Sequence, residues 1–223
     1  MLQRMLSHLH DSVPALERSM RCSVVTGDYQ YYHYLCDGQD DRGWGCGYRT
    51  LQTIISWLKH NYITNRDMTI PMPSLRKIQE ILVEMGDKPE HFVGSKEWIG
   101  SVEVGLVIDQ MFDVPCKIIH SRSGQELENV FENLILHFEQ RRCPIMMGGD
   151  LDASSKGIFG ACQTNSSKYF LVLDPHFVAT TKIENIENEY LVKQGWASWV
   201  KLQDFSSSSF YNLCLPQIKI MNK

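Results

Sequence analysis

The sequence predicts an α+β domain in which helices pack on a mainly antiparallel sheet. Apolar residues at helical spacing dominate residues 47–134, whereas apolar runs bounded by turn residues dominate 144–215. Helices and strands that are segregated along a chain are typical of this class. No Gly/Ser-rich or Pro-rich linker divides the 223 residues. We therefore expect one domain over residues 28–223, after a weakly structured segment 1–27.

The first two helices have clear apolar faces and boundaries. A helix over about 47–60 is predicted by apolar residues at i, i+3, i+4 and i+7, namely Leu51, Ile54, Ile55 and Leu58. A second helix is expected after Ser74, a suitable N-cap, and before Gly86. It is expected to bury the residues on its apolar stripe, which are Leu75, Ile78, Leu82 and Met85.

Two further helices are expected before the strands begin. One covers about Val102 to Phe112. The other starts at Ser123, where Glu126 three residues later would complete a capping box, and buries Leu127, Val130, Phe131 and Leu134.

The strands are predicted from their apolar runs and the turns that bound them. Residues 28–36 are rich in aromatic side chains and are expected to be extended, and 37–45 form a loop. An apolar strand over 144–147 ends at Gly148 and Gly149. Residues 157–163 and 169–173 flank Asn165-Ser166-Ser167 and predict a hairpin, and 211–215 form a last strand.

Composition excludes several classes of protein. The formal net charge is -4 and the Lys and Arg residues are scattered, which argues against a nucleic-acid partner. No apolar run has the roughly 20 residues of a membrane-spanning helix. The cysteines are odd in number, seven, and widely spaced, so we expect free thiols in a reducing compartment, the cytoplasm. No metal or cofactor is expected. The nearest metal-ligand candidate is His33, Cys36 and Cys46, without a zinc-like spacing.

Cys46 is the first candidate for chemistry. It follows Gly43-Trp44-Gly45 and begins the strongest helical pattern in the chain. Unpaired N–H groups and the positive end of the helix dipole favour a thiolate at such a position. The neighbouring glycines would let a substrate backbone approach. A buried structural cysteine at a helix start is the alternative interpretation.

Asp174-Pro175-His176 is the second candidate. It follows an apolar strand, and if the chain stays extended, residues 174 and 176 point to the same face. A carboxylate beside an imidazole can orient it and stabilise its charged form. Taken alone, this tripeptide also fits a strand-end turn with polar surface residues. Together with Cys46, it predicts a thiol activated by an imidazole, without a metal.

Such a nucleophile also needs donors for an oxyanion, and the Cys46 N–H is one of them. Sequence spacing does not rank the tyrosines that precede the loop as a second donor; these are Tyr29, Tyr31, Tyr32 and Tyr34.

Four motifs resemble the proteases specific for the ubiquitin-fold modifier, in that family's order and over about residues 28–217. They are DRGWGCGYRTLQT at 41–53, FVGSKEWIG at 92–100, LDPH at 173–176 and YNLCLP at 211–216. The resemblance implies a papain-like cysteine-protease fold. It implies that Cys46 is the nucleophile, His176 the general base, Asp174 the residue that orients it and Tyr34 the oxyanion-hole tyrosine.

The resemblance also implies a substrate and a subtype. The substrate is the ubiquitin-fold modifier, cut after its C-terminal glycine in the precursor or in lysine conjugates. The chain resembles the short, single-domain form of the family, and we expect a monomer. Trp98 is a candidate for lining the channel for the modifier's tail, and Gly148 and Gly149 for letting it pass. A core tryptophan and a simple turn are the alternatives.

Two rival functions remain at this point. Autophagins, which trim the autophagy modifier, also use Gly-Trp-Gly-Cys and Asp-Pro-His, but Gly47-Tyr48-Arg49 differs from the pattern that usually follows their cysteine. A non-catalytic protein that only binds the modifier is the other rival, although all the matched catalytic positions are present.

Overall fold

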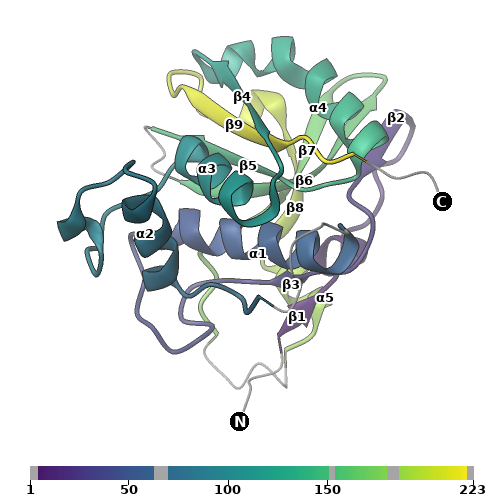
Figure 1. Cartoon of the computed structure of the whole chain (residues 1–223). Coiled ribbons are helices and arrows are strands. Elements are labelled where there is room, and N and C mark those ends of the chain that lie inside the picture. Colours follow the sequence, from purple (N-terminus) through teal and green to yellow (C-terminus); the bar gives the residue numbers. More distant parts are fainter. Residues whose placement is uncertain (1–4, 63–69, 151–153, 180–185, 220–223) are drawn as a thin grey trace.

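The computed structural model describes residues 5–62, 70–150, 154–179 and 186–219. Within these residues seven strands form one sheet, in the order β4-β9-β5-β6-β7-β8, with β2 paired to β6 (Figure 1). Every pairing in this sheet is antiparallel. The strands are β2 Ser19–Val24, β4 Cys116–Ser121, β5 Ile145–Gly149, β6 Ser155–Thr164, β7 Lys168–Leu173, β8 Ala197–Lys201 and β9 Tyr211–Pro216.

Helices cover both faces of the sheet. Figure 1 shows α1 (Cys46–Asn61) and α4 (Leu127–Arg141) on opposite sides of the strands, with α3 (Ser101–Phe112) beside α1. The helix α2 (Leu75–Glu84) packs on α3, and the short α5 (Asn188–Lys193) precedes β8. The expected α+β class, with helices on a mainly antiparallel sheet, is confirmed.

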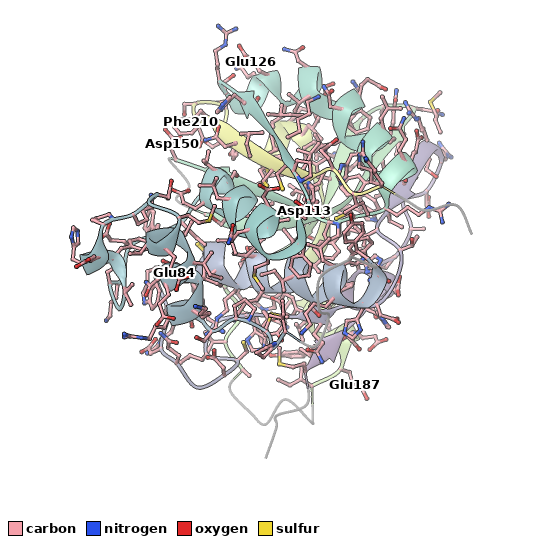
Figure 2. All side chains as sticks on the ribbon, in the orientation of Figure 1. Glu84, Asp113, Glu126, Asp150, Glu187 and Phe210 are labelled. Atoms are coloured by element: carbon pink, nitrogen blue, oxygen red, sulfur yellow. The ribbon has the colours of Figure 1, made fainter. Side chains whose placement is uncertain are left out.

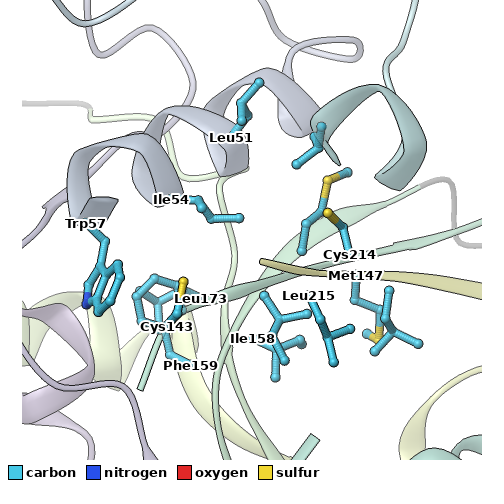
Figure 3. Close-up of a cluster of buried hydrophobic side chains, with 14 of the residues drawn as sticks. Leu51, Ile54, Trp57, Cys143, Met147, Ile158, Phe159, Leu173, Cys214 and Leu215 are labelled. Carbon is cyan, nitrogen blue, oxygen red and sulfur yellow. The ribbon is translucent and has the colours of Figure 1, made fainter. Parts of the chain in front are cut away.

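Burial of α1 accounts for the position of that helix, because every residue from Cys46 to Leu58 is buried. Ile54 and Trp57 point from α1 toward the sheet, which carries Phe159 and Leu173 (Figure 3). These side chains are between 0% and 3% exposed. Removing this much apolar surface from water fixes the helix, and with it the location of Cys46 at its first turn.

The long strand β6 joins the N-terminal segment to the core. Its first residues pair with β5, and its later residues, from Gly160, pair with β2. Residues 5–27 are therefore more ordered than the expected weakly structured segment. Arg21 of β2 also forms ion pairs with Glu132 and Glu139 of α4 at 2.8 and 2.7 Å. Backbone pairing in the sheet supplies order that no apolar pattern in this segment signals.

The second helix forms where it was predicted. The Ser74 side chain accepts a hydrogen bond from the Lys77 N–H, and Gly86 follows the end of the helix with a φ of +78°. The prediction that Met85 is buried was wrong, because this residue is 37% exposed. Met85 lies at the C-cap, beyond the last turn that faces the core.

The capping box at Ser123 was also wrong. The α-helix starts at Leu127, and a 3₁₀ turn, η3 (Gly124–Glu126), precedes it. The Glu126 carboxylate accepts hydrogen bonds from Arg122 instead of from the Ser123 N–H.

A small second sheet lies near the N-terminus. β1 (Leu6–Ser7) pairs with β3 (Gln30–Tyr31), part of the segment expected to be extended. Further along, Tyr34 forms an isolated parallel bridge with Val178, which brings the aromatic segment beside the chain that follows β7. Among the described helices, none combines the length and apolar character needed to cross a bilayer.

Candidate active site

Cys46 is the first residue of α1 and is 6% exposed. The glycines beside Cys46 were expected to let a substrate backbone approach, but in the structure they allow close packing within the protein. A Cβ on Gly45 would stand 2.2 Å from Asp41 Oδ2, and one on Gly47 would stand 2.4 Å from the carbonyl oxygen of Ile99. The loop and the helix therefore fit closely around the thiol because these two positions lack side chains.

A buried ion pair fixes the loop before Cys46. Asp41 accepts from the Arg49 Nε–H at 2.7 Å, and both side chains are fully buried. The other Asp41 oxygen accepts from the Leu35 N–H at 2.9 Å, where Leu35 has a φ of +60°. The Asp41 carbonyl accepts from the Gly45 N–H at 2.7 Å. One carboxylate thus links the segment after Tyr34 to the start of α1.

His176 and Asp174 meet in a turn after β7. The His176 N–H donates to Asp174 Oδ1 at 3.0 Å, and the same oxygen lies 2.5 Å from His176 Nδ1. The Asp174 side chain thus accepts from the backbone N–H two residues later, which is the geometry of an Asx turn. The turn replaces the expected continuation of the strand. The predicted pairing forms, but by local hydrogen bonding and not by strand periodicity.

Ionisation of the pair is strongly perturbed. Burial disfavours the charged imidazole, but hydrogen bonds with Asp174 and Cys46 outweigh it and raise the pKa of His176 to about 9. Burial also disfavours the thiolate and the carboxylate, yet bonds with His176 lower the pKa of both Cys46 and Asp174 below their ordinary values. Lys156 Nζ, 3.6 Å from Asp174 Oδ2, adds to the lowering of the pKa of Asp174. This arrangement favours a thiolate–imidazolium pair.

Tyr34 is the tyrosine whose hydroxyl reaches the thiol. Its side chain hydrogen-bonds with Cys46, and its ring packs edge-on against the His176 ring at 5.0 Å. Burial, followed by the nearby Cys46, raises the pKa of Tyr34, so its hydroxyl stays protonated and able to donate. Tyr31 instead donates to the Asp174 carbonyl, and Tyr29 bonds to His10. Position alone therefore ranks the four tyrosines.

A groove of about 340 Å³ opens beside Cys46. Trp98, Gly148 and Gly149 all line it, as their candidate role requires. The Trp98 indole is 56% exposed and donates to the Gly43 carbonyl at 3.0 Å, so it is not a core tryptophan. Asp150 and Phe210, which also line the groove, lie side by side, and the Phe210 N–H donates to the Asp150 carboxylate at 3.0 Å (Figure 2). The role of these residues in binding a substrate stays a prediction.

The alternative metal candidate has other contacts. His33 Nδ1 lies 2.9 Å from the Tyr34 carbonyl oxygen, and burial lowers the pKa of His33. In the parts of the chain that the structure describes, no three His, Cys, Asp or Glu side chains gather as metal ligands would.

With this geometry in place, comparison with known proteins identifies the family. The model of peptidase family C78 matches residues 20–214. The chain belongs to peptidase family C78. Among relatives of this family, the rice "Probable Ufm1-specific protease" is 44% identical over 87% of this chain, and the mouse "Ufm1-specific protease 1" is 42% identical over 93%. The crystal structure of UfSP from C. elegans is 33% identical over 96% of this chain, with a TM-score of 0.80.

These relatives differ greatly in length. The chain spans 91% of the mouse protein, but only 30% of the rice protein and 38% of the C. elegans chain. The match to the C. elegans structure runs along nearly the whole chain, in agreement with the papain-like fold that the motifs imply.

Two side chains at the site carried no signal in the sequence. Ser155 lines the groove with Cys46 and contributes to lowering the pKa of that thiol, and Lys156 lies beside Asp174. Both are at the start of β6, two and one residues before the predicted strand 157–163, and neither stands in a motif that we singled out. Only the pairing of β6 with β5 and β7 carries them to the site.

Proposed function

We propose that the protein is a thiol protease that cuts after the C-terminal glycine of the ubiquitin-fold modifier. The observation that carries the proposal is the Asp174–His176 hydrogen bond together with the lowering of the Cys46 pKa by His176, at a thiol that lines a groove. Family membership supports it, because the named C78 relatives are described as Ufm1-specific proteases. The substrate would be the precursor, the lysine conjugates, or both, since the bond to be cut follows the same glycine in each of them.

The reaction uses the groups in the order of their contacts. The Cys46 thiolate attacks the glycine carbonyl carbon, so that an S–C bond forms and the carbonyl π electrons move to oxygen. The Tyr34 hydroxyl and the Cys46 N–H stabilise that oxyanion. The intermediate then collapses, the C–N bond breaks, and the His176 imidazolium gives its proton to the leaving amine. Water hydrolyses the thioester, His176 takes the proton, and the thiolate is regenerated.

The groove suits an extended tail that ends in glycine. Gly148 and Gly149, which offer no side chain, line the groove together with Trp98 and Cys46. A tail with a bulky final residue would meet a buried thiol with little room around it, so glycine would be selected sterically.

A protein that only holds the modifier is the contrasting possibility, and the lowered pKa of Cys46 favours an enzyme over it. The test is to incubate the protein with the modifier precursor and with a lysine-linked conjugate. Cleavage is expected in the wild type and not in a folded Cys46→Ala variant. Processing by that variant would overturn the assignment, and a modifier probe with a C-terminal electrophile that binds without forming an adduct would indicate a binder.

An autophagin-like substrate is tested in the same experiment. Supplying the precursor of the autophagy modifier beside that of the ubiquitin-fold modifier should give cleavage of the second alone. The reverse selectivity would contradict the proposed substrate while leaving the thiol-protease chemistry intact.

We further propose that the protein works as a monomer in the cytoplasm. All seven cysteines are free thiols, as a reducing compartment would maintain them, and the groove and the thiol belong to one chain. Sedimentation at working concentration and fractionation of cells that express the protein would test these two points.

A further inference from the structure

Ser155 stands at the junction of the groove and the thiol. It is the first residue of β6 and pairs directly with Gly148 of β5. Ser155 is 8% exposed, and it lines the same groove as Cys46. A serine this buried needs partners for its hydroxyl, because an unpaired buried hydroxyl is costly.

Ser155 acts on the sulfur of Cys46. Both residues line the groove, and the backbone and the side chain of Ser155 each contribute to lowering the pKa of the Cys46 thiol. Donors to a sulfur favour its charged form over the neutral thiol. The N–H and the hydroxyl of one residue therefore act together on the atom that becomes the nucleophile.

The contact differs from those of the other groups around the sulfur. His176 and Tyr34 pack against each other, ring to ring, and neither lines the groove. Ser155 lies on the groove itself and is held by the ladder between β5 and β6. A donor that is fixed by a sheet keeps the sulfur oriented without the entropy loss of ordering a free side chain.

On this basis, and resting on the proposed role of Cys46 as nucleophile, we propose that Ser155 is a further catalytic residue. Its N–H and its hydroxyl donate to the Cys46 thiolate in the free enzyme and hold the sulfur toward the groove. When the S–C bond forms, the sulfur loses its negative charge and these bonds weaken, so the hydroxyl can turn to other acceptors. Ser155 thus raises the fraction of enzyme that is ready to react, most of all in mildly acidic solution.

The test follows the ionisation of Cys46 without any modifier. Alkylation of Cys46 by iodoacetamide is measured at about pH 4 to 9, and the modified cysteine is identified by peptide mass spectrometry. In Ser155→Ala the N–H remains and only the hydroxyl is lost. The midpoint of the profile should rise by about half to one pH unit, which lowers the alkylation rate about three- to tenfold below the midpoint.

Two variants serve as controls. Ser155→Thr keeps a hydroxyl and should restore most of the wild-type profile. Ser121→Ala removes another buried hydroxyl, one that donates to the Ser123 carbonyl and lies outside the groove, and should leave the midpoint in place. An unchanged midpoint in Ser155→Ala, or an equal shift in Ser121→Ala, would overturn the role of Ser155.

The outcome is separable from the proposed function. If wild-type protein fails to cleave the modifier while Ser155→Ala still shifts the midpoint, the substrate is wrong and the role of Ser155 at the thiol stands. If the wild type cleaves and the midpoint does not move, the protease stands and Ser155 does not act on the thiolate. If Ser155→Ala does not fold, the comparison of Ser155→Thr with the wild type decides. A midpoint in Ser155→Thr that rises by the half to one pH unit expected for Ser155→Ala would contradict the proposal.

Discussion

The Asp174→Asn variant should lose activity in a manner that depends on pH. Asp174 accepts at 2.5 Å from His176 and is the largest contribution that favours the imidazolium. The amide is nearly the same size but carries no charge. Removing the charge should therefore lower the pKa of His176 from about 9 toward the ordinary value of about 6.5.

The magnitude follows from the two pKa values. With a pKa of about 9, roughly three quarters of His176 is protonated at about pH 8.5, and nearly all of it at about pH 6. With a pKa of about 6.5, only about 1% is protonated at about pH 8.5, but about three quarters still is at about pH 6. The ratio of wild-type to variant kcat/KM should thus grow by up to about sixtyfold between these pH values. The Cys46 contact, which also raises the pKa of His176, remains and makes this an upper limit.

The assay is kcat/KM for cleavage of the modifier precursor from about pH 5.5 to 9. A lost orientation of the imidazole would add a constant factor at every pH, so the change in the ratio isolates the electrostatic part. Asp109→Asn, an exposed site on α3, changes the net charge equally and should give a ratio that stays flat. A flat ratio for Asp174→Asn as well would refute the reasoning that Asp174 holds the imidazole in its charged form.

Three further variants probe the rest of the site. Tyr34→Phe should lower kcat about ten- to a thousandfold, the range for one oxyanion donor, and unchanged kinetics would remove Tyr34 from the site. Gly148→Ala would put a methyl group 3.8 Å from both Ser101 Oγ and Ser155 Oγ in the groove. It should raise KM for the modifier tenfold or more yet leave iodoacetamide alkylation of Cys46 within about threefold; equal losses in both assays would contradict a steric effect on the tail. Asp41→Asn breaks a fully buried ion pair and should lower the free energy of unfolding by about 3–5 kcal/mol in urea titrations. The exposed pair of Asp40 and Arg42 is the control, because Asp40→Asn should leave the free energy of unfolding nearly unchanged; similar losses in the two variants would show that burial does not set the cost.

The strands that the sequence analysis missed share a place in the sheet. Within the residues that the structure describes, β4 and β8 lie at its two edges, and β2 pairs only with β6. Their residues are mostly half-buried or exposed, so the apolar alternation that reveals a strand is weak. The central strands β5 and β7 are buried and were predicted closely. An edge strand forms because its backbone pairs with a strand far along the chain, and local composition does not predict that pairing.

At the site, the reactive groups could be predicted from local sequence, but the choice among the tyrosines could not, because it depends on tertiary contacts. Cys46 at the start of a helix and the Asp174–His176 pair follow from helix periodicity and from a short motif. Nothing local separates Tyr34 from Tyr32, because both lie on the same face of an extended segment. The distinction depends on contacts with distant residues, namely the bridge from Tyr34 to Val178 and the bond from the Tyr34 N–H to the Pro175 carbonyl.

Those contacts explain how two distant pieces of chain form one site. The Tyr34 N–H donates to the Pro175 carbonyl at 2.9 Å, within the turn that holds His176. The next residue, Leu35, donates its N–H to Asp41, which is paired with Arg49 on α1. The turn after β7 and the first turn of α1 are therefore joined through residues 34–41, and not only through the bond between the sulfur and the imidazole. It follows that the Asp41–Arg49 ion pair sets the distance between thiol and imidazole as well as the stability of the loop, because loss of the Asp41 charge loosens both ends of this link.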